Sequence, residues 1–270
     1  MALTIATWNI NSVRLRSGLV QKFLKENKPD ILCLQETKCP DDQFPHGDFR
    51  KLGYGHIAVS GQKGYHGVAI LSRLPFATQS VKQFAGKTDC RHISVELSDK
   101  AGQASGLTVH NFYVPAGGDI PDPEANEKFA HKLAFLDEMS LWGKKEKPAQ
   151  KKAVLVGDLN VAPLEHDVWS HKQMIDVVSH TPIECTKLNA AIKLGKWVDA
   201  VRTLKPEPEK LFTWWSYRAA DWISSNRGRR LDHIWVSEDL TVNLKKTDIH
   251  RDARGWERPS DHVPVTLTIA

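Results

Sequence analysis

The chain has 270 residues, of which 37 are Lys or Arg and 32 are Asp or Glu, so its formal net charge is +5. This composition is ordinary for a packed protein and excludes global disorder. Four cysteines without a CxxC pair argue against a disulfide scaffold and a cysteine zinc site. No apolar run approaches the roughly 20 residues that span a bilayer. The polar N-terminus is not typical of a signal peptide, so we expect a soluble, cytoplasmic protein.

Short apolar runs bounded by Gly or Pro predict nine strands. In chain order they cover 3–8, 30–35, 56–60, 67–72, 92–97, 107–114, 153–157, 231–237 and 263–269. Apolar residues spaced three or four apart predict helices over 13–26 and 124–142. The polar, basic segment 143–152 is interpreted as a loop. We therefore expect one α+β domain over residues 1–270, with two mixed sheets packed face to face and helices outside.

Polar side chains gather where the predicted strands begin or end. Each of them alone is more typical of a turn or a helix cap. Ends of some strands and starts of others share one edge of a sheet if those strands run antiparallel. Six such strand ends therefore favour a shared site, and its members are Asn9, Asn11, Glu36, Tyr113, Asp158, Asn160, Asp232, Asp261 and His262.

The residue types at these strand ends restrict the chemistry. Several carboxylates in one pocket repel each other unless a cation neutralises them. Oxygen ligands with no cysteine and one histidine favour Mg²⁺ or Mn²⁺ over zinc. Such ions act on phosphate esters, and Asp232 is expected to orient His262, fix its tautomer and raise its pKa. The residues alone predict a metal-assisted hydrolase of phosphate monoesters or diesters.

Six segments together resemble the exonuclease III family of abasic-site endonucleases, within the endonuclease/exonuclease/phosphatase superfamily. They are TWNINSVRLR, LQETK, NFYVP, GDLN, NRGRRLDHIWVS and SDHVPV, and they run through almost the whole chain. The resemblance implies a four-layer α/β sandwich with its active site at one edge. It also implies a DNA repair enzyme of base excision that cleaves the phosphodiester 5′ to abasic sites in duplex DNA. Accessory 3′–5′ exonuclease or 3′-phosphodiesterase activity is expected as well.

The resemblance further implies roles for individual residues. Glu36 would bind Mg²⁺, or Mn²⁺, with Asn9 and Asp261 contributing directly or through water. Asp158 would position or deprotonate the attacking water, with His262 as the alternative base. The number of metal ions, one or two, stays open. Asn160 would bind the phosphate, and Tyr113 would contact the phosphate or the leaving oxygen. The Asp232–His262 pair would stabilise charge on the phosphoryl group. Asp158 and Asn160 are also implied as further metal ligands.

Substrate choice is expected in the aromatic and basic segment 212–231. In the family such loops enter the minor groove and line a pocket for the flipped-out abasic sugar. Arg229 stands where certain relatives have a bulky apolar or aromatic residue near the pocket. The segment 116–119 contains glycines and Asp119, where some relatives have a basic residue that inserts into DNA. For the tryptophans, core packing is an equally good interpretation. The expected DNA-binding residues are Asn11, Trp214, Trp215, Asn226, Arg227 and Arg229, with Arg230 as a further phosphate contact.

Two other classes of function stay open. A phosphatase or phosphodiesterase for small or lipid substrates is disfavoured by the arginines and tryptophans of 212–231. A catalytically silent DNA-binding module is disfavoured because every expected polar position is filled. We expect a monomer that acts on duplex DNA with abasic sites or 3′ ends and does not associate with membranes.

Overall fold

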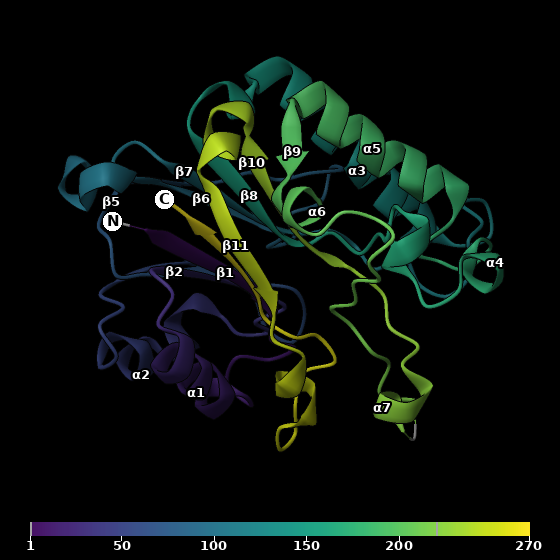
Figure 1. Cartoon of the computed structure of the whole chain (residues 1–270), viewed down its shortest axis with the longest axis horizontal. Helices are drawn as coiled ribbons and strands as arrows, with labels where there is room; N and C mark the ends of the chain where they lie inside the picture. Colours follow the sequence, from purple (N-terminus) through teal and green to yellow (C-terminus); the bar gives the residue numbers. More distant parts are fainter. Residues whose placement is uncertain (1, 220) are drawn as a thin grey trace.

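The apolar runs of the sequence form two six-stranded sheets in a computed structural model, which describes residues 2–219 and 221–270 (Figure 1). The first sheet contains β1 Leu3–Asn9, β2 Ile31–Gln35, β3 His56–Ser60, β4 Val68–Ser72, β11 Leu244–Ile249 and β12 Val265–Ile269. The second contains β5 Phe76–Val81, β6 His92–Leu97, β7 Thr108–Tyr113, β8 Ala153–Asp158, β9 Trp197–Asp199 and β10 Asp232–Ser237. Their spatial orders are β11-β12-β1-β2-β4-β3 and β5-β6-β7-β8-β10-β9.

The strand directions bring four strand ends and two strand starts to the same edge. In the first sheet β1 pairs parallel with β2, and in the second β7 pairs parallel with β8. The neighbours β12 and β10 run antiparallel to β1 and β8. The C-terminal ends of β1, β2, β7 and β8 therefore lie beside the N-terminal ends of β10 and β12, as the antiparallel arrangement in the prediction requires.

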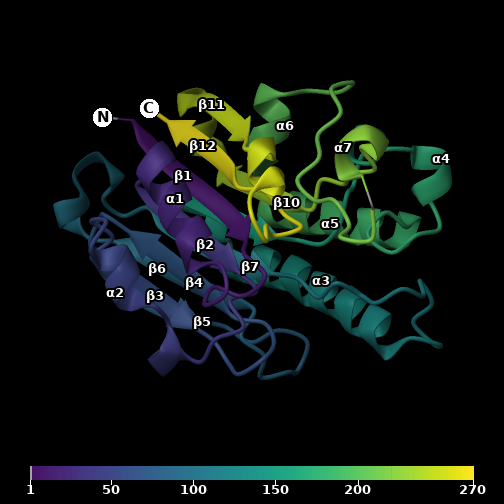
Figure 2. The same cartoon turned by 90° about the horizontal axis from the view of Figure 1, so that it is seen from below.

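Helices cover the outer faces of both sheets (Figures 1 and 2). The first sheet is covered by α1 Ser17–Asn27 and α2 His46–Arg50, and the second by α3 Glu127–Glu146 and α5 Pro182–Gly195. The short helices are α4 His171–Met174, α6 Ala200–Leu204 and α7 Trp222–Ser225. The predicted four-layer sandwich is confirmed.

Apolar side chains fill each space between the layers. Ile5 of β1 and Val154 of β8 belong to the cluster between the sheets. Trp8 of β1 packs on the other side, against Phe23 of α1. Leu155 of β8 likewise packs outward, in a cluster with α3 and α5. Because the central strands are buried on both faces, they are near-continuous apolar runs, which is why the sequence revealed them.

The structure adds elements that the apolar pattern did not predict. Strand β5 is almost entirely exposed at the edge of its sheet, β11 carries two exposed lysines, and β9 has only three residues. Helix α5 was also not predicted. Helix α3 extends through residue 146, so the first part of the predicted loop 143–152 is helical. Among residues 2–219 and 221–270, no helix is both long and apolar enough to cross a membrane.

Candidate active site

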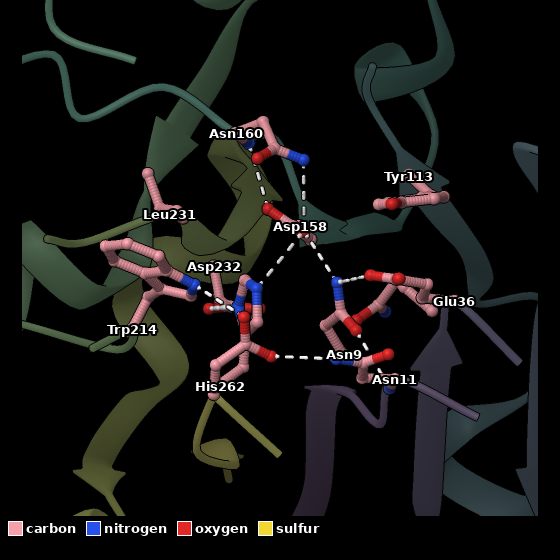
Figure 3. Close-up of polar contacts among 12 residues, drawn as sticks. Asn9, Asn11, Glu36, Tyr113, Asp158, Asn160, Trp214, Leu231, Asp232 and His262 are labelled. Carbon is pink, nitrogen blue, oxygen red and sulfur yellow. Dashed lines mark hydrogen bonds and ion pairs between the residues drawn. The ribbon is translucent and has the colours of Figure 1, made fainter. Parts of the chain in front are cut away.

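The predicted polar side chains meet at one edge of the two sheets (Figure 3). Asn9 ends β1, Tyr113 and Asp158 end β7 and β8, and Asp232 begins β10. In the second sheet, Asp158 is in register with both Tyr113 and Asp232. The turn after β8 adds Asn160, and the loops after β2 and before β12 add Glu36, Asp261 and His262. The predicted convergence of these groups is confirmed.

Asp158 lies at the centre of the cluster and is 1% exposed. Its Oδ2 accepts hydrogen bonds from Asn9 Nδ2 at 2.8 Å and Asn160 Nδ2 at 3.0 Å, and its Oδ1 accepts one from the Asn160 backbone N–H at 3.0 Å. Burial raises the pKa of Asp158 to about 7, and repulsion from Asp232 and Glu36 acts in the same direction. A carboxyl group with such a pKa exchanges a proton near neutral pH, which suits a general base.

The end of β8 and the turn after it, which position Asp158, depend on two unusual backbone conformations. Gly157 has φ +147°, and a Cβ there would lie 1.9 Å from the carbonyl oxygen of Phe112. Only glycine fits this close approach between β7 and β8. Asn160 follows with φ 54°, and Glu36 has φ 55° on the other side of the site. Left-handed backbone at residues other than glycine is uncommon and clusters at functional sites.

Asp232 and His262 form a buried pair beside Asp158. His262 Nδ1 lies 2.8 Å from Asp232 Oδ2, and His262 Nε2 lies 3.7 Å from Asp158 Oδ2. Burial lowers the pKa of His262, but the carboxylates of Asp232 and Asp158 outweigh it and raise this pKa to about 10. His262 therefore holds a proton at neutral pH and donates through Nδ1 to Asp232. Asp232 lies where the prediction places it to orient His262, and its charge acts to raise the pKa of His262.

A chain of polar contacts connects Glu36 to Asp261 across the first sheet. Glu36 Oε2 accepts from Asn9 Nδ2 at 3.0 Å, and Glu36 Oε1 lies 2.8 Å from Lys38 Nζ. Lys38 also donates to Asn11 Oδ1 at 2.6 Å, and Asn11 Nδ2 donates to Asp261 Oδ1 at 3.2 Å. The amide of Asn11 thus links Lys38 to Asp261 inside the site, a contact in addition to the predicted one with DNA.

Tyr113 faces this cluster with most of its ring buried, at 8% exposure. Burial raises the pKa of Tyr113 well above its ordinary value, and the charges of Glu36 and Asp158 raise it further. The phenol is therefore neutral and able to donate a hydrogen bond to an oxygen of a substrate. Arg91 stacks on the ring at 4.9 Å, and its Nη1 donates to the Tyr113 carbonyl oxygen at 3.2 Å, which fixes the residue's position.

A cavity of about 820 Å³ opens directly beside these groups. Trp214, Arg227, Arg229 and Leu231 line it together with Asp158. Several carboxylates and a histidine on one side of the cavity therefore face an aromatic and cationic wall on the other.

Two residues of this wall are held in place by neighbours. Trp214 Nε1 donates to Asp261 Oδ2 at 2.9 Å, so this indole is tied to the acidic cluster. The Arg229 guanidinium lies 4.9 Å from the Trp214 ring centroid. Arg229 Nη1 donates to Ser179 Oγ at 2.9 Å and to the Val178 carbonyl at 3.0 Å. The wall of this chain therefore contains a guanidinium held by two neighbouring acceptors.

Two predicted DNA contacts are wrong. Trp215 is 2% exposed, lies in an apolar cluster with Phe212, and donates through Nε1 to Asn226 Oδ1 at 3.1 Å, so it packs behind the cavity and does not line it. Arg230 is 0% exposed, and its guanidinium is taken up by Asp167 and by Asp199.

The other predicted residues of this segment are accessible. Asn226 and Arg227 are exposed, and the Arg227 guanidinium lies 4.7 Å from the ring of Trp169, another residue of the cavity wall. Asn226 Oδ1 also accepts from Arg251 Nη2 at 3.1 Å. Both remain candidates for DNA contact.

Two supporting residues were missed by the sequence argument. Arg91 holds Tyr113, but nothing in the sequence distinguishes it from a surface arginine. Lys132 is 0% exposed and donates to the carbonyl oxygen of Asn160 at 2.8 Å. Its position was detectable, because it lies between Phe129 and Leu136 on the apolar stripe of a predicted helix, where a lysine is out of place.

A sandwich of two sheets with helices on both outer faces and this acidic, histidine-containing edge is the architecture of a phosphoester hydrolase. The chain belongs to the endonuclease/exonuclease/phosphatase family, whose model matches residues 6–262. The predicted resemblance, the fold class and the enzyme class are confirmed. Nucleases of this family depend on a metal ion, and one atom from each of Asp158, Asp232 and His262 lies within 4.8 Å of the others, in a possible metal-binding cluster.

Particular relatives narrow the similarity. Exodeoxyribonuclease III of Haemophilus influenzae is 30% identical over 267 residues, which cover 96% of this chain and 97% of that protein. A solved AP endonuclease structure from Archaeoglobus fulgidus has a TM-score of 0.89 at 34% identity and covers 99% of both chains. A 3′ phosphatase from Neisseria, bound to product hairpin DNA, has a TM-score of 0.89 at 32% identity, again over 99% of both chains.

Proposed function

We propose that this protein is a Mg²⁺-dependent DNA repair hydrolase that cleaves the phosphodiester on the 5′ side of abasic sites in duplex DNA. The observation that carries the proposal is the adjacency of the Asp158–His262 cluster to a cavity walled by Trp214 and Arg229. The cluster supplies the groups for phosphodiester hydrolysis. The wall offers an aromatic face and a cation, which suit an extruded sugar and its flanking phosphates.

The charges of the site fit a divalent cation. Among the described residues, four carboxylates, those of Glu36, Asp158, Asp232 and Asp261, lie within the cluster itself, where the ion pairs are formed with two cations, Lys38 and His262. The excess of two negative charges matches one Mg²⁺, or one Mn²⁺, and part of the rise in the pKa of Asp158 comes from this excess.

Oxygen atoms of Glu36 and Asp261, with Asn9, are the proposed ligands of that ion, and Asp158 and Asn160 are further candidates. When bound, the ion would polarise the phosphoryl oxygen and lower the pKa of a bound water.

The other residues have roles that follow from their geometry. Asp158, with its raised pKa, accepts a proton from the attacking water, and His262 places a positive charge beside it for the developing phosphoryl charge. Tyr113 donates a hydrogen bond to the phosphate or the leaving oxygen. Both hydrogens of Asn160 Nδ2 are already donated, to Asp158 Oδ2 and to the Val114 carbonyl, so the first function of Asn160 is to orient Asp158, and phosphate binding requires one of these two bonds to break.

Processing of 3′ ends is the second activity that we propose. The Neisseria relative is a 3′ phosphatase bound to product DNA, and Arg229 offers this chain a cation in the cavity wall for an anionic 3′ group. We further propose that the chain is a single domain that acts as a monomer in the cytoplasm. We propose no membrane-bound substrate for it. The shared apolar cluster between the two sheets supports the single domain.

The decisive assay uses a duplex with one tetrahydrofuran abasic analogue. We expect incision on its 5′ side with Mg²⁺, release of a 3′-hydroxyl product, and no incision after EDTA. Intact duplex under both conditions, with folded protein, would sink the proposal. Cleavage of a small phosphodiester in place of DNA would favour the alternative, a phosphatase or phosphodiesterase for small or lipid substrates.

Asp158→Asn tests the proposed base within the same assay. The amide keeps the shape of the carboxyl group but cannot take a proton, so turnover is expected to fall by about 10²–10⁴-fold while DNA affinity stays close to that of the wild type. Asp137→Asn is the matched control, because Asp137 is exposed on α3, does not line the cavity and, among the described residues, forms its ion pair with Lys187. An unchanged rate in Asp158→Asn would remove Asp158 from the mechanism.

A further inference from the structure

Lys132 of α3 is a fully buried lysine with an ionic partner on a second helix. Its side chain is 0% exposed and forms an ion pair with Glu184 of α5, which is also 0% exposed. Burying two charges is costly unless hydrogen bonds satisfy their remaining donors and acceptors. The other contacts of this pair therefore show what it holds.

The ammonium group of Lys132 uses its two other donors on loops that border the active site. Lys132 Nζ donates to the carbonyl oxygen of Asn160 at 2.8 Å and to that of Ala116 at 3.2 Å. Asn160 is the residue with left-handed backbone whose N–H and side-chain amide both bond to Asp158. Ala116 lines the cavity on the other side. One ammonium group thus fixes two walls of the site.

Glu184 connects the same pair to the part of the cavity wall that contains Ser179 and Arg229. Its two carboxylate oxygens accept from the Ser179 N–H at 3.0 and 2.9 Å, and Oε2 also accepts from Thr181 Oγ1 at 2.6 Å. Ser179 Oγ in turn accepts from Arg229 Nη1 at 2.9 Å. The buried ion pair is therefore joined by hydrogen bonds to Asp158 at one end and to Arg229 in the cavity wall at the other.

Holding α3 against α5 does not explain these contacts. The two helices already share an apolar cluster that includes Leu136 and Leu188. A second ion pair, Lys187 with Asp137 at 2.5 Å, bridges the same helices at the surface. A buried pair whose purpose is packing is commonly replaced by apolar residues without loss. Apart from the capping-box contact of Glu184 with Thr181 at the start of α5, the further contacts of the pair go to Ala116, Asn160 and Ser179, which all line the cavity.

We propose that Lys132 and Glu184 are positioning residues for catalysis, which set the backbone of Asn160 and, through it, the orientation of Asp158. This inference rests on the proposed function. Loss of the pair frees the Asn160 carbonyl, and with it the left-handed backbone that aims two hydrogen bonds at Asp158. A displacement of about 1 Å in a reacting group lowers the rate about 10²-fold, whereas DNA contacts elsewhere on the surface are unaffected.

The test compares the double variant Lys132→Met/Glu184→Met with Lys187→Met. Both remove one ion pair between α3 and α5, and the double variant leaves no unpaired buried charge. With the abasic duplex and saturating enzyme, we expect the single-turnover rate of the double variant to fall about 10–100-fold with Kd for DNA within about twofold of wild type. Lys187→Met keeps the wild-type rate. A folded double variant with the wild-type rate would overturn the proposal, as would a loss confined to Kd.

Lys132→Arg takes the place of the double variant if that protein does not fold. It preserves the charge opposite Glu184, but a planar guanidinium cannot direct its donors to the same three points. We expect the fold to be kept and the single-turnover rate to fall, and a wild-type rate would count against the proposal. Failure of the wild-type enzyme to cut the abasic duplex would instead defeat the proposed function, so the two failures are distinguishable.

Discussion

Two arginines only three positions apart, Arg227 and Arg230, are expected to respond differently to replacement by methionine. The Arg230 guanidinium is fully buried and donates to Asp167 Oδ1 at 2.7 Å, Asp167 Oδ2 at 2.8 Å and Asp199 Oδ2 at 2.8 Å. Removing one partner of a buried ion pair costs about 3–5 kcal/mol. Asp167 keeps a second partner in Arg202, so we expect Arg230→Met to lower the free energy of unfolding by about 3 kcal/mol.

The expected change in melting temperature follows from the chain length. An unfolding entropy of about 2.1 cal/mol/K per residue, taken over the whole chain, converts this loss into a Tm lower by about 5 °C. Arg227 is exposed and stacks on Trp169, so Arg227→Met leaves Tm nearly unchanged. Arg227 is a proposed phosphate contact, and the loss of one such contact reduces the slope of log K against log salt by about 1.

Calorimetry and DNA binding at several salt concentrations measure both effects. Each variant is compared with the wild type at a temperature where all three proteins are folded. The reasoning is refuted if Arg230→Met keeps the wild-type Tm, or if it lowers the salt slope as Arg227→Met does. Either result would mean that the Arg230 guanidinium reaches DNA and is not confined to its carboxylate partners.

Three further predictions address the site and the core. Asp232→Asn removes the main group that raises the pKa of His262, so the alkaline limb of the turnover profile should move to lower pH. Burial lowers the pKa of His233 from 6.5 to about 4, so its contribution to stability is complete above pH 6.5 and is lost as the pH falls toward 4. Urea unfolding at pH 5 should show a free energy of unfolding lower by about 2 kcal/mol from this residue. Trp214→Ala should raise KM for the abasic duplex and lower Tm less than Trp215→Ala, which should lower the free energy of unfolding by about 3–5 kcal/mol.

The sequence was sufficient for the layers of the fold because its central strands are buried on both faces. Strand β8, for example, is apolar over five consecutive residues and has no exposed position. Strand β11 is different, since the consecutive residues Lys245 and Lys246 both face solvent at the edge of a sheet, and a polar strand without alternation resembles a loop in the sequence. Helix α5 was missed although Thr181 and Glu184 form a capping box at its start, a signal that local reasoning can detect.

The sequence was sufficient to predict which residues gather at the site, but not which residues of 212–231 face the cavity and which are buried. Asp158, Asp232 and His262 were found because each stands at the end or start of an apolar run. Sequence alone cannot separate Trp214 from Trp215, since neighbouring residues in this segment face opposite directions, one toward the cavity and one into the core. The same holds for Arg229 and Arg230, whose different partners, Ser179 and Asp167, lie about 50 to 60 residues earlier in the chain.

The geometry of the site also depends on a contact that lies beneath it, between the two sheets. Asn111 of β7 is 0% exposed and donates through Nδ2 to the carbonyl oxygens of Leu34 and Ala69, both at 2.9 Å, in the opposite sheet. Gln35 Nε2 donates back to Asn111 Oδ1 at 2.7 Å. Glu36 directly follows Gln35, and Tyr113 lies two residues beyond Asn111. The amide contact therefore fixes the distance between the carboxylate from one sheet and the phenol from the other, so that the separation of the sheets sets the width of the active site.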